Sequence, residues 1–222
     1  SIKTAGGMSL ENIMVYVYNT DGYIVAKNPT DENGNVSFTL PASPDYKLEL
    51  SGVPDGYILK DKYDMGTNGT NIVLVSEVIE DTDLSGVTYK LGMIMHDFEV
   101  TTSDGQTFKL SEVLKTKKAV MLNFWYTNCS WCVKEFPVMA EAYNEYKDDV
   151  EILALDPMNE GAEAVKAFHT QNNLPFPMAE CPTSWSNVFG ITGYPTSVFI
   201  DQYGVICCVE AGAITSLRPF VS

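Results

Sequence analysis

Residues 124–137 read FWYTNCSWCVKEFP, and they decide the fold of the region that contains them. Cys129 and Cys132 form a C-x-x-C motif within this stretch. The run AVMLNF at 119–124 is typical of a buried β-strand, and the residues from Ser130 to Lys147 are expected to form a helix. The motif is therefore predicted to open a helix that directly follows a buried strand.

Cys129 is predicted to be the attacking nucleophile of this motif. Unpaired N–H groups and the helix dipole stabilise a thiolate at a helix N-terminus, where they lower a thiol pKa from about 8.5 toward about 7 or below. Cys132 lies one helical turn further on, close enough to resolve a mixed disulfide formed at Cys129. We therefore expect a redox-active Cys129–Cys132 disulfide and no other cofactor.

Zinc binding and a purely structural cross-link fit the motif less well. A C-x-x-C pair can be half of a zinc site, which needs two further Cys or His ligands. No second C-x-x-C or H-x-x-x-H occurs among the remaining candidates, which are His96, His169, Cys181, Cys207 and Cys208. A structural disulfide is disfavoured because a pair at the start of a helix is poorly placed to staple loops. We expect no metal site, and we interpret the other three cysteines as bystanders to the redox pair.

The sequence on either side of the motif alternates between strand and helix patterns. The expected elements are a hairpin with a strand at 98–101 and a turn at 104–105, a short helix at 111–114, a strand at 150–155, helices at 160–172 and 184–189, strands at 197–201 and 205–210, and a short final helix from 215. Strands that alternate with helices and close on a hairpin predict an α/β fold with helices on both faces of the sheet.

Residues 193–201 read GYPTSVFID, which places Pro195 directly before a strand. Proline at this position is a candidate for a cis peptide bond. A cis bond would expose the Tyr194 backbone beside the dithiol, where an extended substrate peptide could pair with it. We therefore predict substrate contacts from Tyr194, Pro195 and Thr196, and from the bulky Trp131 inside the C-x-x-C motif.

The two motifs together resemble the thioredoxin fold, and within it the TlpA/ResA family of extracytoplasmic thiol–disulfide oxidoreductases. The resemblance covers about residues 93–214. Asn123 occupies the position where thioredoxins have an acid, and Glu135 with the two residues after it matches the family's Glu beyond the second cysteine. The helix expected within 157–172 matches the family's insertion. The resemblance implies a thioredoxin fold with a TlpA-type helical insertion.

Glu135 gains a catalytic role from this resemblance. It follows Cys132 at i+3 and therefore shares its helix face. If its carboxyl group is buried, its pKa rises and it can exchange a proton with Cys132. The chain departs from the family at Asn128, where Trp is common, and in the dipeptide Ser130-Trp131, which leaves the direction of electron flow open.

The first 80 residues have a different pattern. Short β-branched or aromatic runs occur at 14–18, 36–40, 46–50 and 72–75, with turn sequences such as Asp21-Gly22 between them. Regular short strands of this kind predict an all-β sandwich. Residues 1–78 also resemble the prealbumin-like Cna-B/SpaA repeats of Gram-positive surface proteins, through the segments TDENGNVSF and VPDGY.

Many such repeats form an intramolecular Lys–Asn isopeptide bond that a Glu promotes. Leu50 stands at the position of that Glu. We therefore expect no cross-link between Lys3 and Asn71, and we interpret this region as a spacer or interaction module held by ordinary packing.

Length and charge set the remaining limits. A chain of 222 residues favours two domains, which we place at 1–78 and 95–222 with a linker at 79–94. There are 29 Asp and Glu against 14 Lys and Arg, and the net charge of −15 disfavours nucleic acid and anionic lipid as partners. No run reaches the roughly 18–20 apolar residues that span a bilayer. Because the chain opens without Met, we expect a signal or anchor in a segment outside it.

The sequence thus predicts an extracytoplasmic, surface- or membrane-anchored thiol–disulfide oxidoreductase that acts more as a reductant than an oxidant. Its expected partners are exported proteins with thiols or disulfides, including apocytochrome c, and a membrane thiol protein that donates or accepts electrons. One alternative is a thiol peroxidase, although the Pro-x-x-x-Thr-x-x-Cys pattern is missing around Thr127. Another is a surface binding module in which the redox domain is accessory.

Overall fold

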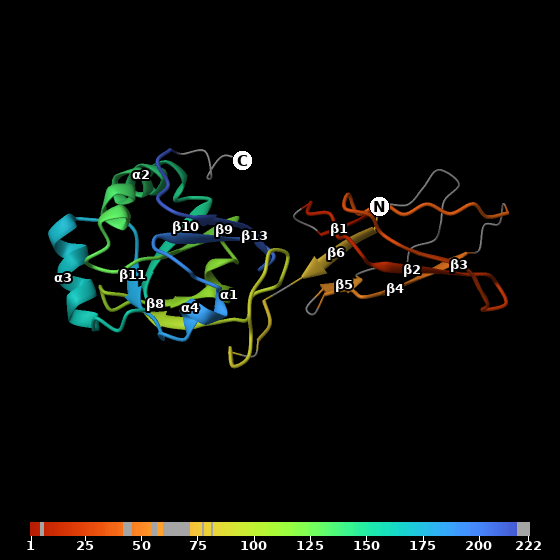
Figure 1. Ribbon diagram of the computed structural model, residues 1–222, viewed down its shortest axis with the longest axis horizontal. Helices are drawn as coiled ribbons and strands as arrows, with labels where there is room; N and C mark the ends of the chain where they lie inside the picture. The colour runs from red at the N-terminus through yellow and green to blue at the C-terminus, as the bar shows by residue number, and fades with distance from the viewer. Residues whose placement is uncertain are drawn as a thin grey trace. The chain divides into compact units, whose positions relative to one another are not determined.

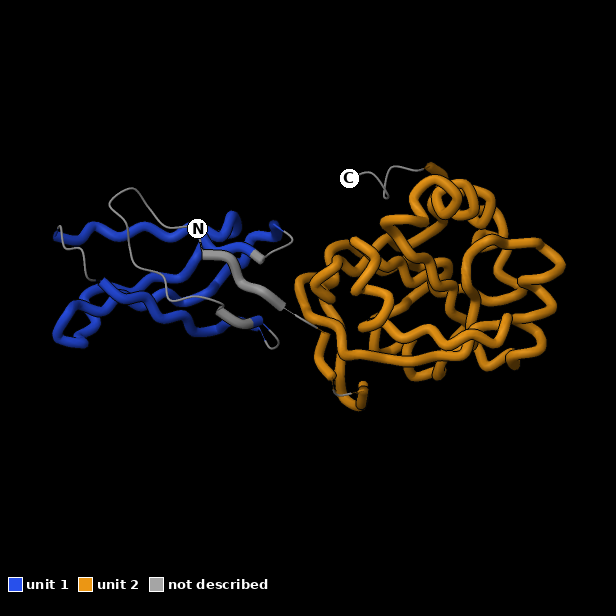
Figure 2. The backbone as a smooth tube through the Cα atoms, turned by 180° about the vertical axis from the view of Figure 1, so that it is seen from behind, with its two compact units in different colours: residues 1–77 blue, residues 78–222 orange. Residues whose placement is uncertain are grey.

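The computed structural model describes residues 1–4, 7–41, 46–54, 57–59, 72–76, 78–80 and 82–216. The chain divides into two compact units, unit 1 at 1–77 and unit 2 at 78–222 (Figure 2). The C-x-x-C motif belongs to unit 2. No helix in these described ranges is both long and apolar enough to cross a membrane.

A five-stranded sheet forms the centre of unit 2 (Figure 1). Its order is β11 (Met178–Glu180), β10 (Val150–Asp156), β9 (Ala119–Phe124), β12 (Thr196–Asp201) and β13 (Ile206–Ala211). The strands β9, β10 and β11 run parallel, whereas β12 is antiparallel to both β9 and β13. The strand β9 is therefore central, which explains its nearly continuous apolar sequence.

Helices cover both faces of this sheet, with α2 on one side and α1 and α4 on the other (Figure 1). The helices are α1 (Leu110–Val113), α2 (Ser130–Tyr146), α3 (Ala162–Asn172) and α4 (Trp185–Val188), and a hairpin is formed by β7 (Glu99–Thr101) and β8 (Thr107–Lys109). This arrangement agrees with the expected α/β architecture. The strand β11 was not expected from the sequence.

Alternation along β9 assigns each of its side chains to one core. Val120, Leu122 and Phe124 join a cluster with Trp185 of α4. Met121 belongs to a second cluster, which also contains the two cysteines of the motif and residues of α2 and α3. Because neighbouring strand residues face opposite ways, Asn123 lies on the same face as Met121. The only polar residue of this strand therefore faces α2.

Two expectations for unit 2 differ from the structure. Residues 79–94 are part of unit 2 instead of a linker. Tyr89 is 7% exposed and donates its backbone N–H to the carbonyl of Val188, and Gly92 donates its N–H to the carbonyl of Ile206. The segment is therefore packed onto unit 2 by a buried aromatic residue and backbone hydrogen bonds, despite its acidic composition. The short final helix expected from Thr215 does not begin there, because Thr215 and Ser216 are not helical, and 217–222 lie outside the described residues.

The described residues of unit 1 form two three-stranded sheets. One is antiparallel, with order β3 (Ile24–Pro29), β2 (Met14–Tyr18) and β4 (Lys47–Ser51). The other has order β1 (Ile2–Thr4), β6 (Ile72–Ser76) and β5 (Tyr57–Leu59), with β1 parallel to β6. No helix occurs among its described residues. The likeness to a prealbumin-like domain stays a prediction.

The strand expected at 36–40 is absent from both sheets. Exposure alternates along this segment as a strand pattern predicts, but its backbone takes no regular strand pairing. The structure instead has β3, whose residues are nearly all exposed and so carry no buried alternation to detect. The strands β1 and β5 were also unexpected. Asn71, which we expect to form no cross-link with Lys3, lies outside the described residues.

Candidate active site

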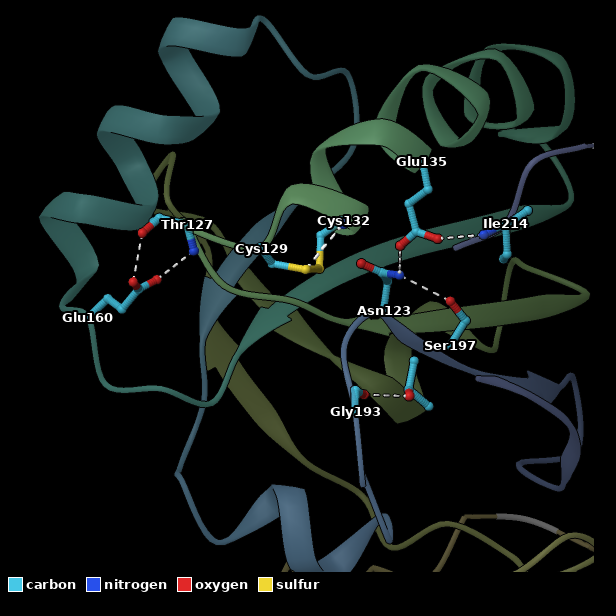
Figure 3. The surroundings of a disulfide bond; sticks show 10 residues. Asn123, Thr127, Cys129, Cys132, Glu135, Glu160, Gly193, Ser197 and Ile214 are labelled. Carbon is cyan, nitrogen blue, oxygen red and sulfur yellow. Dashed lines mark hydrogen bonds between the residues drawn. A yellow bond between two sulfur atoms is a disulfide. The ribbon is translucent and has the colours of Figure 1, made fainter. Parts of the chain in front are cut away.

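The site is built around a disulfide between Cys129 and Cys132 (Figure 3). Cys129 is the N-cap of α2, and its sulfur accepts a hydrogen bond from the backbone N–H of Cys132 at 3.1 Å. Cys129 retains 3% of its surface, whereas Cys132 is fully buried. The first cysteine therefore has both the helix-terminal N–H and the remaining access to solvent.

A carboxylate fixes the loop that leads into Cys129. Thr127 donates its backbone N–H to Oε2 of Glu160 at 2.7 Å and its hydroxyl to Oε1 at 2.6 Å (Figure 3). Glu160 lies between β10 and α3, in the region expected to hold the family's insertion. Hydrogen bonds to an ionised acceptor are stronger than neutral ones. This pair therefore ties the dithiol loop to the β10–α3 connection.

A buried hydrogen-bond network lies on the other side of the disulfide. Nδ2 of Asn123 donates to Oε1 of Glu135 at 2.7 Å and to the hydroxyl of Ser197 at 3.0 Å. The second carboxylate oxygen of Glu135 accepts the backbone N–H of Ile214 at 2.8 Å. Asn123 and Ser197 face each other across the β9–β12 ladder, so the strand register itself brings them together.

Glu135 is fully buried on the face of α2 that also carries Cys132. Burial raises the pKa of its carboxyl group to about 7, although the hydrogen bonds from Ile214 and Asn123 oppose that rise. A group with this pKa can gain or lose a proton near neutral pH. The predicted burial of Glu135 is thus correct, and its role in catalysis remains a prediction.

The carbonyl oxygen of Asn123 has no hydrogen-bond partner among the described residues, although it is buried. Figure 3 shows the amide between the disulfide and the Glu135 carboxylate, with this oxygen pointing toward the disulfide. Buried polar atoms are normally paired, and an unpaired one calls for a physical reason.

The peptide bond between Tyr194 and Pro195 is cis, as the sequence predicted. Thr196 is 5% exposed, and its hydroxyl donates to the carbonyl of Gly193 at 2.8 Å. The ring of Tyr194 lies edge-on to Tyr126 with centroids 5.4 Å apart, and its hydroxyl is 2.9 Å from that of Ser186. These contacts brace the segment before β12, while substrate binding by Tyr194, Pro195 and Thr196 stays a prediction.

Two tryptophans near the disulfide differ in exposure: Trp125 is buried and Trp131 is exposed. Trp125 is fully buried in the same cluster as the two cysteines. Trp131 is 59% exposed, and the Lys134 ammonium lies 4.1 Å from its ring centroid. Asn128 is exposed. Trp125 therefore packs with the two cysteines inside the core, and Trp131 remains open to solvent.

The other cysteines are unpaired in the structure. Burial raises the thiol pKa of Cys181 above its ordinary value. Cys207 is exposed as a residue, but desolvation of its thiol and the nearby Asp201 raise its pKa to about 11, and desolvation also raises the pKa of Cys208. High thiol pKa values disfavour the reactive thiolate. Among the residues the structure describes, no group of three or more His, Cys, Asp or Glu side chains could hold a metal ion.

Three functional candidates were not recognised from the sequence: Ser197, Thr127 with its partner Glu160, and the pairing role of Asn123. A polar residue inside a buried strand was the available signal for Asn123 and Ser197, because such a residue needs a buried partner. No local signal marked Thr127 and Glu160, which are 33 residues apart.

The central mixed sheet, its flanking helices and the disulfide at the start of α2 define a thioredoxin-fold redox domain. The fold agrees with a solved structure, the thioredoxin domain of a thiol-disulfide oxidoreductase from Bacteroides vulgatus, which is 22% identical with a TM-score of 0.50. That likeness covers 61% of this chain and 100% of the other.

The chain belongs to the AhpC/TSA family, whose model matches residues 91–208. It is 39% identical over 119 residues to the thiol-disulfide oxidoreductase ResA of Bacillus cereus, which covers 53% of this chain and 67% of that protein. It is also 31% identical over 121 residues to the thioredoxin-like protein YneN of Bacillus subtilis, covering 54% and 70% of the two chains. The protein is therefore a redox enzyme of the thiol–disulfide oxidoreductase type.

Proposed function

We propose that this protein reduces disulfides in exported proteins through the Cys129/Cys132 dithiol. The observation that carries the proposal is the asymmetry of the pair. Cys129 retains 3% of its surface and its sulfur accepts a helix-terminal N–H, whereas Cys132 is fully buried one turn further on. Such a pair supports an attacking and a resolving cysteine.

The reaction has two exchange steps. The thiolate of Cys129 attacks one sulfur of a substrate disulfide, and the other substrate sulfur leaves as a thiolate that takes a proton from solvent. Cys132 then loses its proton, attacks the sulfur of Cys129 and displaces the second substrate thiolate. Two electrons pass to the substrate, which ends as two thiols, and the Cys129–Cys132 disulfide forms.

Glu135 is proposed to take up the proton that Cys132 releases. Its pKa of about 7 allows the carboxylate to be protonated and deprotonated again near neutral pH. Its place on the helix face of Cys132 supports this role. Trp131, Tyr194, Pro195 and Thr196 are proposed to contact the substrate peptide around Cys129.

The test is the reduction of insulin disulfides with dithiothreitol as electron source, followed by the turbidity of the precipitating B chain. We expect the unsubstituted protein to accelerate reduction and Cys129→Ser to lose that activity, while Cys207→Ser serves as a matched control that keeps it. Equal activity of Cys129→Ser would contradict the proposal. Consumption of hydrogen peroxide at a comparable rate would favour the thiol peroxidase instead.

The direction of electron flow is tested by the reduction potential of the Cys129/Cys132 couple. A potential near about −270 mV is typical of a reductant and one near about −120 mV of an oxidant. We expect the lower range.

Residues 1–78 are proposed to form a prealbumin-like spacer or interaction module, and the protein is proposed to act outside the cytoplasm. Its substrates would be exported proteins with thiols or disulfides, including apocytochrome c, and its electrons would come from a membrane thiol protein. The resemblance of both regions to exported families supports this. Labelling of Cys129 in intact producing cells by a membrane-impermeant maleimide tests the location, and labelling only after lysis would contradict it.

A further inference from the structure

The carbonyl oxygen of Asn123 is a buried acceptor that no described donor reaches in the oxidised protein. Its orientation is fixed at the other end of the same amide, because Nδ2 donates to both Glu135 and Ser197. Rotating the amide by half a turn would place the carbonyl oxygen against the ionised Glu135 carboxylate, which can only accept, and would lose the hydrogen bond from Nδ2. The network therefore holds the oxygen where Figure 3 shows it, aimed at the disulfide.

A disulfide has no hydrogen to donate, whereas a thiol has one. Reduction of the pair by a dithiol breaks the bond between Cys129 and Cys132, adds two electrons and leaves Cys132 with a proton, while the reductant becomes a disulfide. Cys132 is fully buried, so its new S–H group has no access to water as an acceptor. Figure 3 shows the unpaired oxygen of Asn123 on the Cys132 side of the disulfide, where the new S–H donor would be.

We propose that Asn123 is the hydrogen-bond acceptor for the Cys132 thiol in the reduced protein, so that its amide oxygen is unpaired in the disulfide form and paired in the dithiol form. The redox consequence rests on the proposed function, since it assumes that the Cys129/Cys132 pair cycles between the two forms. The hydrogen bond itself does not.

This pairing stabilises the reduced form in two ways. The dithiol form gains a hydrogen bond, and the disulfide form carries a buried acceptor without a donor. Both effects favour reduction of the pair, and therefore raise its reduction potential. Removing the acceptor should make the dithiol a stronger reductant.

The direct test is infrared spectroscopy of the S–H stretch, which shifts to lower frequency when the thiol donates a hydrogen bond. In a Cys129→Ala background, subtraction of the spectrum of Cys129→Ala/Cys132→Ala isolates the Cys132 band. We expect this band at lower frequency than that of an exposed thiol, and at higher frequency after Asn123→Leu. Ser197→Ala is the matched control, because it removes a partner of Nδ2 and leaves the oxygen in place.

A double-mutant cycle separates this direct contact from an effect through Glu135, since Asn123 also donates to that carboxylate. In full dithiol protein we expect Asn123→Leu to shift the equilibrium with glutathione about tenfold toward the disulfide, or about 30 mV. The same shift should occur in a Glu135→Gln background. Loss of the shift in that background, or an unmoved S–H band, would overturn the proposal.

If Asn123→Leu fails to fold, the unsubstituted protein still decides the matter. The side-chain carbonyl carbon of Asn123 should show an NMR shift typical of a new hydrogen bond on reduction, and equal shifts in both redox states would contradict the proposal. These measurements are independent of insulin reduction. If the protein fails to reduce insulin but shows the expected S–H band, the proposed function is refuted and the hydrogen bond between Cys132 and Asn123 still stands.

Discussion

The backbone N–H of Cys132 points at the sulfur of Cys129, 3.1 Å away, and this contact belongs to the first turn of α2. A thiolate at this position gains a hydrogen bond and the favourable end of the helix dipole. We expect one thiol of the reduced protein to have a pKa clearly below about 8.5. Alkylation with iodoacetamide across pH, followed by peptide mass spectrometry, should identify it as Cys129. Faster alkylation of Cys132 would reverse the two roles.

Glu135→Gln should change the pH dependence of disulfide exchange without changing the fold. The amide keeps the shape and can accept the N–H of Ile214, but it cannot ionise. The unsubstituted protein should show a rate transition near pH 7, where its buried carboxyl group titrates, and the variant should lose that transition. The check is insulin reduction from pH 5 to 9, with circular dichroism for the fold. A variant that matches the unsubstituted protein throughout would make Glu135 an ordinary buried residue.

Glu135 should also make the stability of unit 2 depend on pH. Its pKa is about 7 in the folded protein and roughly 4.3 when unfolded, so the folded state keeps a proton that the unfolded state releases. The resulting stabilisation is complete below pH about 4.3 and is lost as the pH rises to about 7, a change of about 4 kcal/mol.

The measurement is urea unfolding of the oxidised protein at pH 5 and pH 8. Tryptophan fluorescence reports on unit 2 alone, since Trp125, Trp131 and Trp185 all lie there. Other buried carboxyl groups, such as those of Asp156 and Asp201, also have raised pKa values. The difference between the unsubstituted protein and Glu135→Gln therefore isolates Glu135. A pH-independent difference would contradict the assignment.

Glu160→Ala should loosen the loop that carries the dithiol. It leaves the N–H and the hydroxyl of Thr127 without their carboxylate acceptor, at a cost of roughly 1–3 kcal/mol. We expect insulin reduction to slow several-fold. Glu160→Gln should recover part of the rate, because its amide oxygen can still accept one of the two hydrogen bonds, and Thr127→Val should resemble Glu160→Gln. Unchanged rates in all three variants would show that the loop needs no such contact.

Residues 1–78 should contain no isopeptide bond, because Leu50 replaces the acid that promotes it. Intact mass spectrometry of the reduced protein should give the mass of the unmodified sequence. A loss of about 17 Da, the ammonia released when an amine attacks an amide, would contradict this. Peptide mapping around Lys3 and Asn71 would then locate the link.

The sequence predicted those parts of the site that are encoded locally. Cys129, Cys132 and Glu135 follow one another along a single helix, so their spacing alone places them on one face. Pro195 was recognised because it directly precedes a strand. The contacts of Asn123 with Ser197, and of Thr127 with Glu160, join residues 74 and 33 positions apart. They depend on strand register and on a loop conformation, which no local pattern specifies.

The same limit explains the differences in the fold. The strand pattern at 36–40 reflects alternating exposure, which an extended segment outside a sheet can also have. The exposed strand β3 offers no buried face to detect. Residues 79–94 look like a linker by composition, yet Tyr89 and Ile94 are buried in unit 2. The composition of a segment gives only its average polarity, whereas a few buried side chains are enough to pack the segment against a folded unit.

The unequal burial of the two cysteines has a practical consequence for finding the natural substrate. Of the pair, Cys129 alone retains any surface. In the proposed mechanism a partner protein is attached at Cys129, and its release depends on the buried Cys132. A Cys132→Ala protein would keep that covalent adduct indefinitely. The Cys132→Ala variant can therefore be used to trap substrates: the mixed disulfide is purified under denaturing conditions, and a reducing agent then releases the substrate protein for identification.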